Sequence, residues 1–223
     1  MTATLRITNW VLRRFFQTIC RIDVPELRKV PDRGPLILVG NHINFLEAPI
    51  MVPHLEPRPV SGIAKEESWK NPLFNFLFNQ WHLIPIDRGM VDREAFRLSV
   101  EALKSGKILA ISPEGTRSLD GKLQQAKPGV IALAVRSGAP FMAIGFYGYT
   151  DFWHNIKRLR RTPFHIRVGK AFRLKSGVDP MARDARQVAT DEVMYKIAEL
   201  LPEEYRGFYS NPPAEFQFIE DIP

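Results

Sequence analysis

The chain has 223 residues and a mass of 25.6 kDa, which fits one domain with a substantial buried core. Its single cysteine, Cys20, excludes an internal disulfide and suits a reducing compartment. Lysine and arginine number 31 against 24 aspartate and glutamate residues, and the formal charge of +7 indicates an anionic partner: nucleic acid, acidic phospholipid, a phosphorylated substrate or an acidic carrier protein.

An amphipathic helical segment is predicted over residues 1–30, with its helix at 4–21. Apolar and aromatic side chains stand there among four arginines, with no acidic residue. Such a helix either lies in the plane of an anionic bilayer surface or packs on its own domain. No apolar run reaches the about 18 residues that a membrane span needs, so no transmembrane segment is expected. Cys20 has no nearby histidine and is expected to be a small buried residue.

The unbroken apolar run at residues 35–40 predicts a buried strand, and polar groups follow it abruptly. His42 and Glu47 could not meet in one straight helix, but they can meet across a strand-end turn that leads into a helix from about residue 48. A carboxylate bonded to one imidazole nitrogen leaves the other nitrogen basic, as proton removal from a hydroxyl requires. The alternative is a strand-end histidine, with Glu47 closing an Asn44-x-x-Glu47 capping box.

Two further strands are predicted at residues 58–64 and 83–86, and both lead into charged residues. The first leads to Lys65 and the second to Asp87-Arg88-Gly89. Between them, residues 72–86 carry no Lys, Arg, Asp or Glu, and their apolar residues at helical spacing are typical of a core-facing helix. Phe76 lies off that stripe, so part of this helix is expected to be exposed and apolar, as a lipid contact or as a wall of an acyl groove.

A helix over residues 92–105 and a strand over 107–111 precede the string Pro-Glu-Gly-Thr-Arg-Ser at 113–118. Gly115 allows a tight turn beside a ligand, Thr116 offers a hydroxyl, and Arg117 offers a guanidinium that suits phosphate. Glu114 only accepts hydrogen bonds, so it is expected to orient Arg117 or a substrate hydroxyl. Lys127, at the start of the helix predicted to 137, either reaches a phosphate or is simply solvated.

The last third of the chain is strongly basic and then acidic. A strand is expected at 139–144, and between 154 and 175 eight lysines and arginines occur without an acid. They form either a surface facing a membrane or carrier protein, or a solvated basic face. A short strand at 165–169 and a helix at 184–201 follow. The tail over 202–223 is expected to be draped on the domain or loose.

Alternating strands and helices predict an α/β fold, with a mixed, largely parallel sheet flanked by helices over residues 31–201. Because polar groups cluster where strands end, the site is expected at one edge of that sheet. We find no paired Cys/His spacing for a metal and no phosphate-binding Walker loop in the sequence.

Two motifs together resemble the glycerolipid acyltransferase family, the 1-acylglycerol-3-phosphate acyltransferases, whose hallmarks are Asn-His-x4-Asp and Pro-Glu-Gly-Thr-Arg-Ser. Glu47 stands where the family usually has Asp, so its longer side chain must retract, or the turn must widen, to reach His42. The resemblance covers roughly residues 34–145 and implies an acyltransferase domain. It implies that His42 is the general base and that Glu47 orients it. The residues that it implies for substrate binding are Lys65, Arg88, Glu114, Gly115, Thr116, Arg117 and Lys127.

The predicted function is transfer of a fatty acyl group from acyl-CoA or acyl carrier protein (acyl-ACP) to a lysophospholipid hydroxyl, turning lysophosphatidic acid into phosphatidic acid. No metal or bound cofactor is implied, and direct attack on the thioester is expected, since no covalent nucleophile stands beside His42. The expected place is peripheral or monotopic, on the cytoplasmic side of a membrane and in contact with anionic phospholipid. The alternatives are another lysophospholipid or glycolipid acceptor, or a weakly active lipid-binding membrane-surface protein. Nucleic acid is not an expected partner, because no base-reading module accompanies the basic residues.

Overall fold

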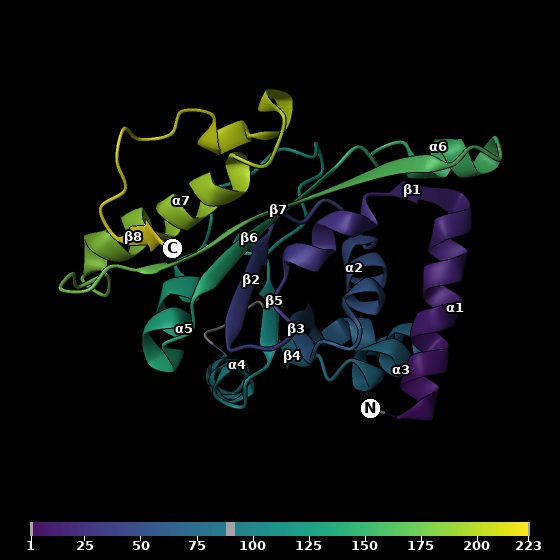
Figure 1. The fold of residues 1–223 in the computed structure, drawn as a ribbon, viewed down its shortest axis with the longest axis horizontal. Coiled ribbons are helices and arrows are strands. Elements are labelled where there is room, and N and C mark those ends of the chain that lie inside the picture. Colours follow the sequence, from purple (N-terminus) through teal and green to yellow (C-terminus); the bar gives the residue numbers. More distant parts are fainter. Residues whose placement is uncertain (1, 88–91, 223) are drawn as a thin grey trace.

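The computed structural model describes residues 2–87 and 92–222, which form one mixed sheet with helices on both faces (Figure 1). Its strands are β1 (Cys20–Ile22), β2 (Leu36–Gly40), β3 (Val60–Lys65), β4 (Ile84–Ile86), β5 (Ile108–Ile111), β6 (Phe141–Tyr147), β7 (Thr162–Leu174) and β8 (Ile219–Asp221). Its α-helices are α1 (Ala3–Ile19), α2 (Glu47–Leu55), α3 (Pro72–Gln80), α4 (Arg93–Lys104), α5 (Gly129–Ser137), α6 (Phe152–Lys157) and α7 (Arg183–Ala198). Short 3-10 helices are η1 (Val24–Lys29), η2 (Glu66–Lys70), η3 (Glu203–Tyr205) and η4 (Gly207–Tyr209).

The centre of the sheet is parallel, which confirms the predicted fold class. The strand order is β1-β7-β6-β2-β5-β3-β4, with β8 paired to β7. Strands β6, β2, β5, β3 and β4 run parallel, whereas β7 runs antiparallel to β6. Strand β2 lies between β5 and β6 with all of its residues buried, as its continuous apolar run predicts for a strand covered on both faces.

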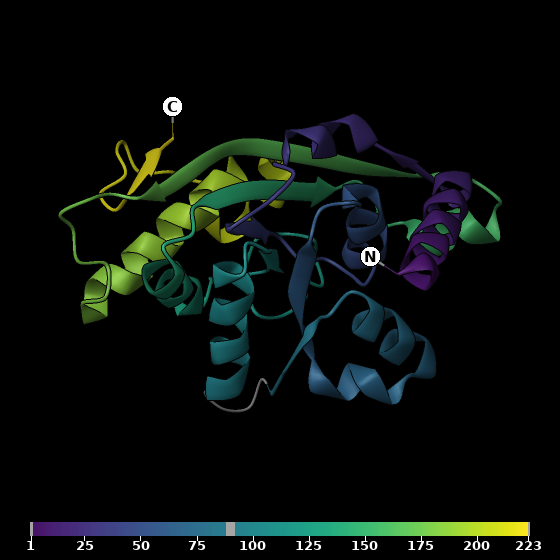
Figure 2. The same cartoon turned by 60° about the horizontal axis from the view of Figure 1, so that its bottom comes forward.

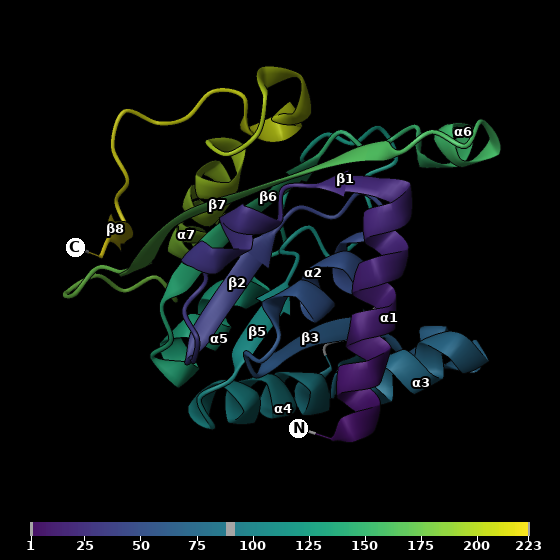
Figure 3. The same ribbon diagram turned by 45° about the vertical axis from the view of Figure 1, so that its right-hand side comes forward.

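Successive residues of β2 face two different cores. Ile37 and Val39 pack with α4, α5 and α7, and Leu36 and Leu38 pack with α1, α2 and η1. Figure 3 shows α1 beside α2 and α3, and a buried bond of 3.0 Å from the Trp81 indole to Asn9 Oδ1 joins the end of α3 to α1. None of the helices in the described part of the chain combines the length and apolar character needed to cross a bilayer.

Both expected extensions, residues 1–30 and 202–223, contribute a strand to the sheet. Strand β1 pairs in parallel with the start of β7, and β8 pairs antiparallel with its end. In Figure 2, β7 is the long green strand that spans the molecule between these two partners. The tail is therefore an ordered part of the domain, held by η3, η4 and β8, rather than a loose segment.

Candidate active site

Polar side chains gather where the parallel strands β2, β5 and β6 end. His42 stands two residues after β2, the 112–118 loop follows β5, and Tyr149 stands two residues after β6. The Asn41 side chain holds the ends of β2 and β6 together, because it donates to the Phe146 carbonyl and accepts from the Phe146 N–H, each at 2.8 Å. Substrates of open α/β sheets bind outside such carboxyl ends, so this edge is the candidate site.

His42 and Glu47 meet at this edge. Glu47 is the first residue of α2, and its Oε2 lies 3.3 Å from His42 Nδ1. Because a carboxylate only accepts hydrogen bonds, Nδ1 carries the proton in this contact and Nε2 keeps its lone pair. The His42 side chain is 28% exposed while that of Glu47 is 8% exposed, so the imidazole remains accessible and the carboxylate is buried.

Glu47 also organises the turn that carries His42. Its Oε1 accepts from the Ile43 N–H at 2.8 Å, the Asn44 N–H at 2.9 Å and the Tyr149 hydroxyl at 2.5 Å. Burial alone would raise the pKa of Glu47, but the bonds from His42, Tyr149 and Asn44 outweigh it and hold this pKa below its usual range. The predicted capping box is not formed, because α2 begins at Glu47 with Leu46 as its N-cap and Asn44 Oδ1 accepts from the Leu46 N–H.

The hydrogen-bond partners of Glu114 differ from those that the sequence suggested. It is buried, and its two oxygens accept from backbone N–H groups, that of His42 at 3.1 Å and that of Gln124 at 3.0 Å. The Ser118 N–H donates in turn to the His42 carbonyl at 2.8 Å. Both backbone groups of His42 are therefore bonded to the 112–118 loop, and the hydrogen-bond partners of Glu114 are backbone N–H groups and not Arg117. Burial raises the pKa of Glu114 to about 7 against the two backbone bonds.

A cavity of about 350 Å³ opens beside His42. Its polar lining includes Gly115, Lys127 and the carboxylates of Asp87 and Asp92. Its apolar walls come from strand ends and from α4 and α5: Ile63, Ile86, Phe96, Ile111, Val130 and Leu133. Gly115 has φ +70°, and a Cβ there would lie 3.3 Å from Lys127 Cδ, so glycine allows the lysine to lie over the turn. The cavity therefore has one lysine, one imidazole, two carboxylates and a largely apolar interior.

The other residues predicted to bind substrate lie in different places in the chain's structure: two on the loop beside His42 and one at the end of β3. Thr116 and Arg117 are exposed on the loop that is bonded to His42. Lys65 is exposed at the end of β3, where its Nζ lies 2.9 Å from Glu67 Oε1, and it is not among the described residues that line the cavity. Arg88 lies outside the described residues.

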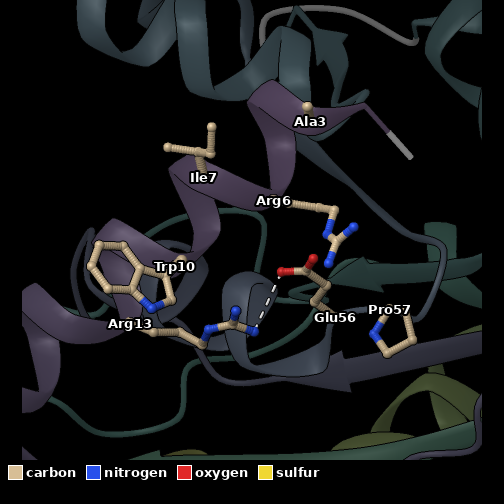
Figure 4. Close-up of a pocket in the computed structure, with 7 residues that line it drawn as sticks. All are labelled: Ala3, Arg6, Ile7, Trp10, Arg13, Glu56 and Pro57. Atoms are coloured by element: carbon tan, nitrogen blue, oxygen red, sulfur yellow. Dashed lines mark ion pairs between the residues drawn. The ribbon is translucent and has the colours of Figure 1, made fainter.

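A second hollow, of about 680 Å³, lies near the end of the sheet at which the parallel strands begin. Its wall includes Pro57, just before β3 begins, whereas the dyad follows the strand ends. Figure 4 shows Arg6 and Arg13 turned toward Glu56, with an ion pair of 3.3 Å between Arg13 Nη1 and Glu56 Oε2. This hollow therefore belongs to the surface of α1 and not to the candidate active site.

Cys20 is a buried thiol that is not reactive at neutral pH. Burial raises the pKa of Cys20 to about 11, so its thiol stays protonated at neutral pH. Within residues 2–87 and 92–222, no three His, Cys, Asp or Glu side chains gather as metal ligands would. The groups assembled at the sheet edge suit proton transfer beside an apolar chain and an anion.

Comparison with known proteins gives consistent matches. A family model described as Acyltransferase matches residues 21–147. A 1-acyl-sn-glycerol-3-phosphate acyltransferase from Borreliella burgdorferi is 26% identical over 156 residues, which is 69% of this chain and 59% of that protein. An N-acylphosphatidylethanolamine synthase from Arabidopsis thaliana is 31% identical over 117 residues, 48% of this chain and 41% of the relative.

One solved structure extends the match to the fold. The crystal structure of the 1-acyl-sn-glycerophosphate acyltransferase PlsC from Thermotoga maritima superposes with a TM-score of 0.61 at 25% identity, covering 85% of this chain and 76% of that one. The chain spans between 48% and 59% of the length of the first four curated relatives that it matches.

Proposed function

The chain belongs to the acyltransferase family, matched over residues 21–147, and from that premise we propose that it moves a fatty acyl group from a thioester to a lysophospholipid hydroxyl. The proposed acceptor is lysophosphatidic acid and the product phosphatidic acid, which the names of the Borreliella and Thermotoga proteins support. The family match confirms the resemblance seen in the sequence. The observation that carries the proposal is the contact between His42 and Glu47 beside an apolar cavity.

In the proposed reaction His42 acts as general base. Its Nε2 takes the proton from the acceptor hydroxyl as that oxygen attacks the thioester carbonyl carbon, and the carbon–sulfur bond then breaks. The imidazolium returns the proton to the departing thiolate, so the histidine ends as it began. Glu47 holds Nδ1–H and stabilises the imidazolium while it exists. Both acyl-CoA and acyl-ACP present such a thioester, and either serves as the proposed donor.

The acceptor phosphate is proposed to lie over Gly115 and Lys127. Lys127 is supported by its place on the cavity wall, and Arg117 by its place on the loop that is bonded to His42. Thr116 would supply a hydroxyl to the same anion, and Arg88 and Lys65 keep the binding role that the sequence resemblance implies. The apolar walls between α4 and α5 suit the fatty acyl chain.

We further propose that α1 contacts an anionic membrane surface, in a peripheral or monotopic arrangement on the cytoplasmic side. Along its outer surface Ile7, Trp10 and Phe15 are 63%, 54% and 54% exposed, although they are large and apolar. In Figure 4, Ile7 and Trp10 project from α1 while Arg6 and Arg13 turn toward Glu56. Aromatic residues beside arginine bind at the headgroup boundary of acidic bilayers.

Co-sedimentation with vesicles tests the membrane proposal. Trp10→Ser with Phe15→Ser should weaken binding to vesicles containing phosphatidylglycerol, because it removes apolar area that enters the bilayer. The matched control is Val135→Ser with Val188→Ser, which removes exposed apolar groups from α5 and α7. Equal binding by both double variants would contradict a role for α1.

A second acceptor class has a specific observation in its favour. The Arabidopsis relative is named for acylation of phosphatidylethanolamine, so family membership alone does not fix the acceptor. Amine acylation needs a base but no site for a terminal phosphate monoester. The proposed phosphate site at Gly115 and Lys127 favours lysophosphatidic acid.

A donor-by-acceptor panel, read by mass spectrometry of the lipid product, tests the function. The purified protein receives acyl-CoA or acyl-ACP with lysophosphatidic acid, another lysophospholipid, a glycolipid or phosphatidylethanolamine. We expect phosphatidic acid and free thiol in equal amounts. Product from a different acceptor would replace the acceptor assignment. Intact vesicle binding with no product from any pair would favour the weakly active lipid-binding alternative.

A further inference from the structure

Tyr149 touches the candidate dyad from outside the segment that the family model matches, which ends at residue 147. Its side chain is fully buried, and its hydroxyl donates to Glu47 Oε1 at 2.5 Å. The ring stacks on Phe164 of β7, with 4.3 Å between ring centroids, so the phenol is held in place by packing as well as by its hydrogen bond. The reaction proposed above gives this residue no part.

Tyr149 can act here only as a hydrogen-bond donor. Burial raises the pKa of its hydroxyl well above the usual value, and the negative charge of Glu47 raises it further. The phenol therefore stays protonated across the pH range of enzyme assays. A protonated phenol facing a carboxylate donates to it, and this bond is one of those that keep Glu47 ionised in spite of its burial.

The bonds to Glu47 are divided between its two oxygens. Oε1 accepts from Tyr149, Ile43 and Asn44, whereas Oε2 lies against His42 Nδ1. The two N–H donors belong to the same turn as Glu47, and Tyr149 is the donor that comes from a distant part of the chain, after β6. A glutamate has one more rotatable bond than aspartate, so a distant anchor restricts the orientation of its carboxylate most effectively.

We propose that Tyr149 is a positioning residue for acyl transfer, fixing the Glu47 carboxylate so that Oε2 faces His42 and holds the imidazole in its base-competent tautomer. The proposal rests on the proposed function and extends the dyad to a chain of three residues, Tyr149, Glu47 and His42. Tyr149 is buried and acts through Glu47, so its removal should lower kcat while leaving the KM values for donor and acceptor nearly unchanged.

Tyr149→Phe provides the test, because it removes the hydroxyl and keeps the ring that stacks on Phe164. Its matched control is Tyr209→Phe, which removes a second fully buried tyrosine hydroxyl, bonded to Asp191 and the Ala126 N–H away from the dyad. We expect kcat to fall about 10-fold in Tyr149→Phe and to change less than 2-fold in the control. Thermal unfolding of both variants establishes a temperature at which both are folded.

The pH profile separates positioning from general damage. Without the Tyr149 bond Glu47 holds a proton more readily, so the acid limb of kcat should move to higher pH by about half a unit or more. Tyr209→Phe should leave that limb in place. An unmoved limb together with a fall in kcat no larger than in the control would overturn the proposal.

A double-mutant cycle tests whether Tyr149 acts through Glu47. Adding Tyr149→Phe to Glu47→Gln should cost less than 2-fold in kcat, since the group that the tyrosine positions is already altered. A further 10-fold loss of kcat would show that Tyr149 does not act through Glu47 and would overturn the proposal.

Nitrogen NMR of the imidazoles distinguishes this inference from the reaction itself. The signal of His42, assigned by its absence in His42→Ala, should report Nδ1–H in the wild type and a mixture of tautomers in Tyr149→Phe. This readout needs no turnover, so it holds or fails even if the acyl-transfer assignment is wrong. An unchanged His42 tautomer in Tyr149→Phe would contradict the positioning role.

Discussion

A carboxylate buried as deeply as Glu47 stays ionised only if donors replace the water that it has lost. Glu47 has such donors on both oxygens, and His42 is among them. An amide at this position could accept on one side only, because its NH₂ group would face a donor on the other. The residue is therefore sensitive to loss of charge as well as to loss of length.

Glu47→Gln should lower kcat by about 10- to 100-fold, less than loss of the base itself, because the imidazole remains but is no longer held and stabilised by a negative charge. Steady-state kinetics with one donor and one acceptor check this. Glu101→Gln, an exposed change on α4, is the control. Unchanged kcat in Glu47→Gln would remove the orienting role from this carboxylate.

We propose that Arg117 binds the acceptor and not the donor. Arg117→Ala should raise the acceptor KM by about 10-fold or more and change the donor KM far less, because a guanidinium binds the phosphate of the acceptor. Arg136→Ala, an exposed arginine on α5, serves as the matched control. Equal increases in both KM values would exclude the phosphate role.

At the scale of elements, strand ends were the most predictable feature of the chain. The apolar run of β2 followed by His42, and the run of β5 followed by the 112–118 loop, place both motifs at one edge because parallel strands share their direction. Strand β7 was harder to see, since it is 13 residues long but only residues 165–169 were expected as strand. Its outward positions carry Arg167 and Arg173, which hide the alternation with buried Ile166 and Phe172.

The 112–118 loop is an element whose stability should depend on pH through Glu114. The folded state holds the proton of Glu114 up to a pKa of about 7, whereas the ordinary value is 4.5. Proton binding by Glu114 therefore stabilises the folded state fully below pH 4.5, and this stabilisation is lost as pH rises through 7. The stability of wild type relative to Glu114→Gln should therefore fall by up to about 3 kcal/mol across this window.

Denaturant unfolding of both proteins from about pH 4 to about pH 8 measures this difference. Glu203→Gln, an exposed change in η3, should show no such trend. If the stability of wild type relative to Glu114→Gln rose with pH, this result would contradict the raised pKa of Glu114. The contacts of Glu114 could not be predicted from sequence, because its partners are backbone groups, and one of them belongs to His42, far away along the chain.

At the scale of the whole molecule, β7 joins both ends of the chain into one sheet. Buried Glu192 on α7 fastens the tail, since it accepts from the N–H groups of Gln217, Phe218 and Ile219 at 2.6, 2.9 and 3.1 Å. The acidic, proline-rich composition of the tail does not reveal this, because the anchor lies in a helix and the bonds are made by the tail backbone.

Glu192→Ala should destabilise the fold by about 2 kcal/mol or more, because it leaves backbone donors without partners. Glu199→Ala, near the end of the same helix and half exposed, should cost about 0.5 kcal/mol or less. Denaturant unfolding gives both values, and limited proteolysis should cut the tail faster in Glu192→Ala. Equal stability of the two variants would mean that the tail contributes little to the domain.

The central claim is that an imidazole at the end of β2 does the chemistry of this domain. Thiol release from acyl-CoA in the presence of lysophosphatidic acid, compared between wild type and His42→Ala at matched thermal stability, tests it most directly. We predict a fall in kcat of about 10²- to 10⁴-fold with an unchanged unfolding midpoint. Thiol release by folded His42→Ala at the wild-type rate would contradict the account.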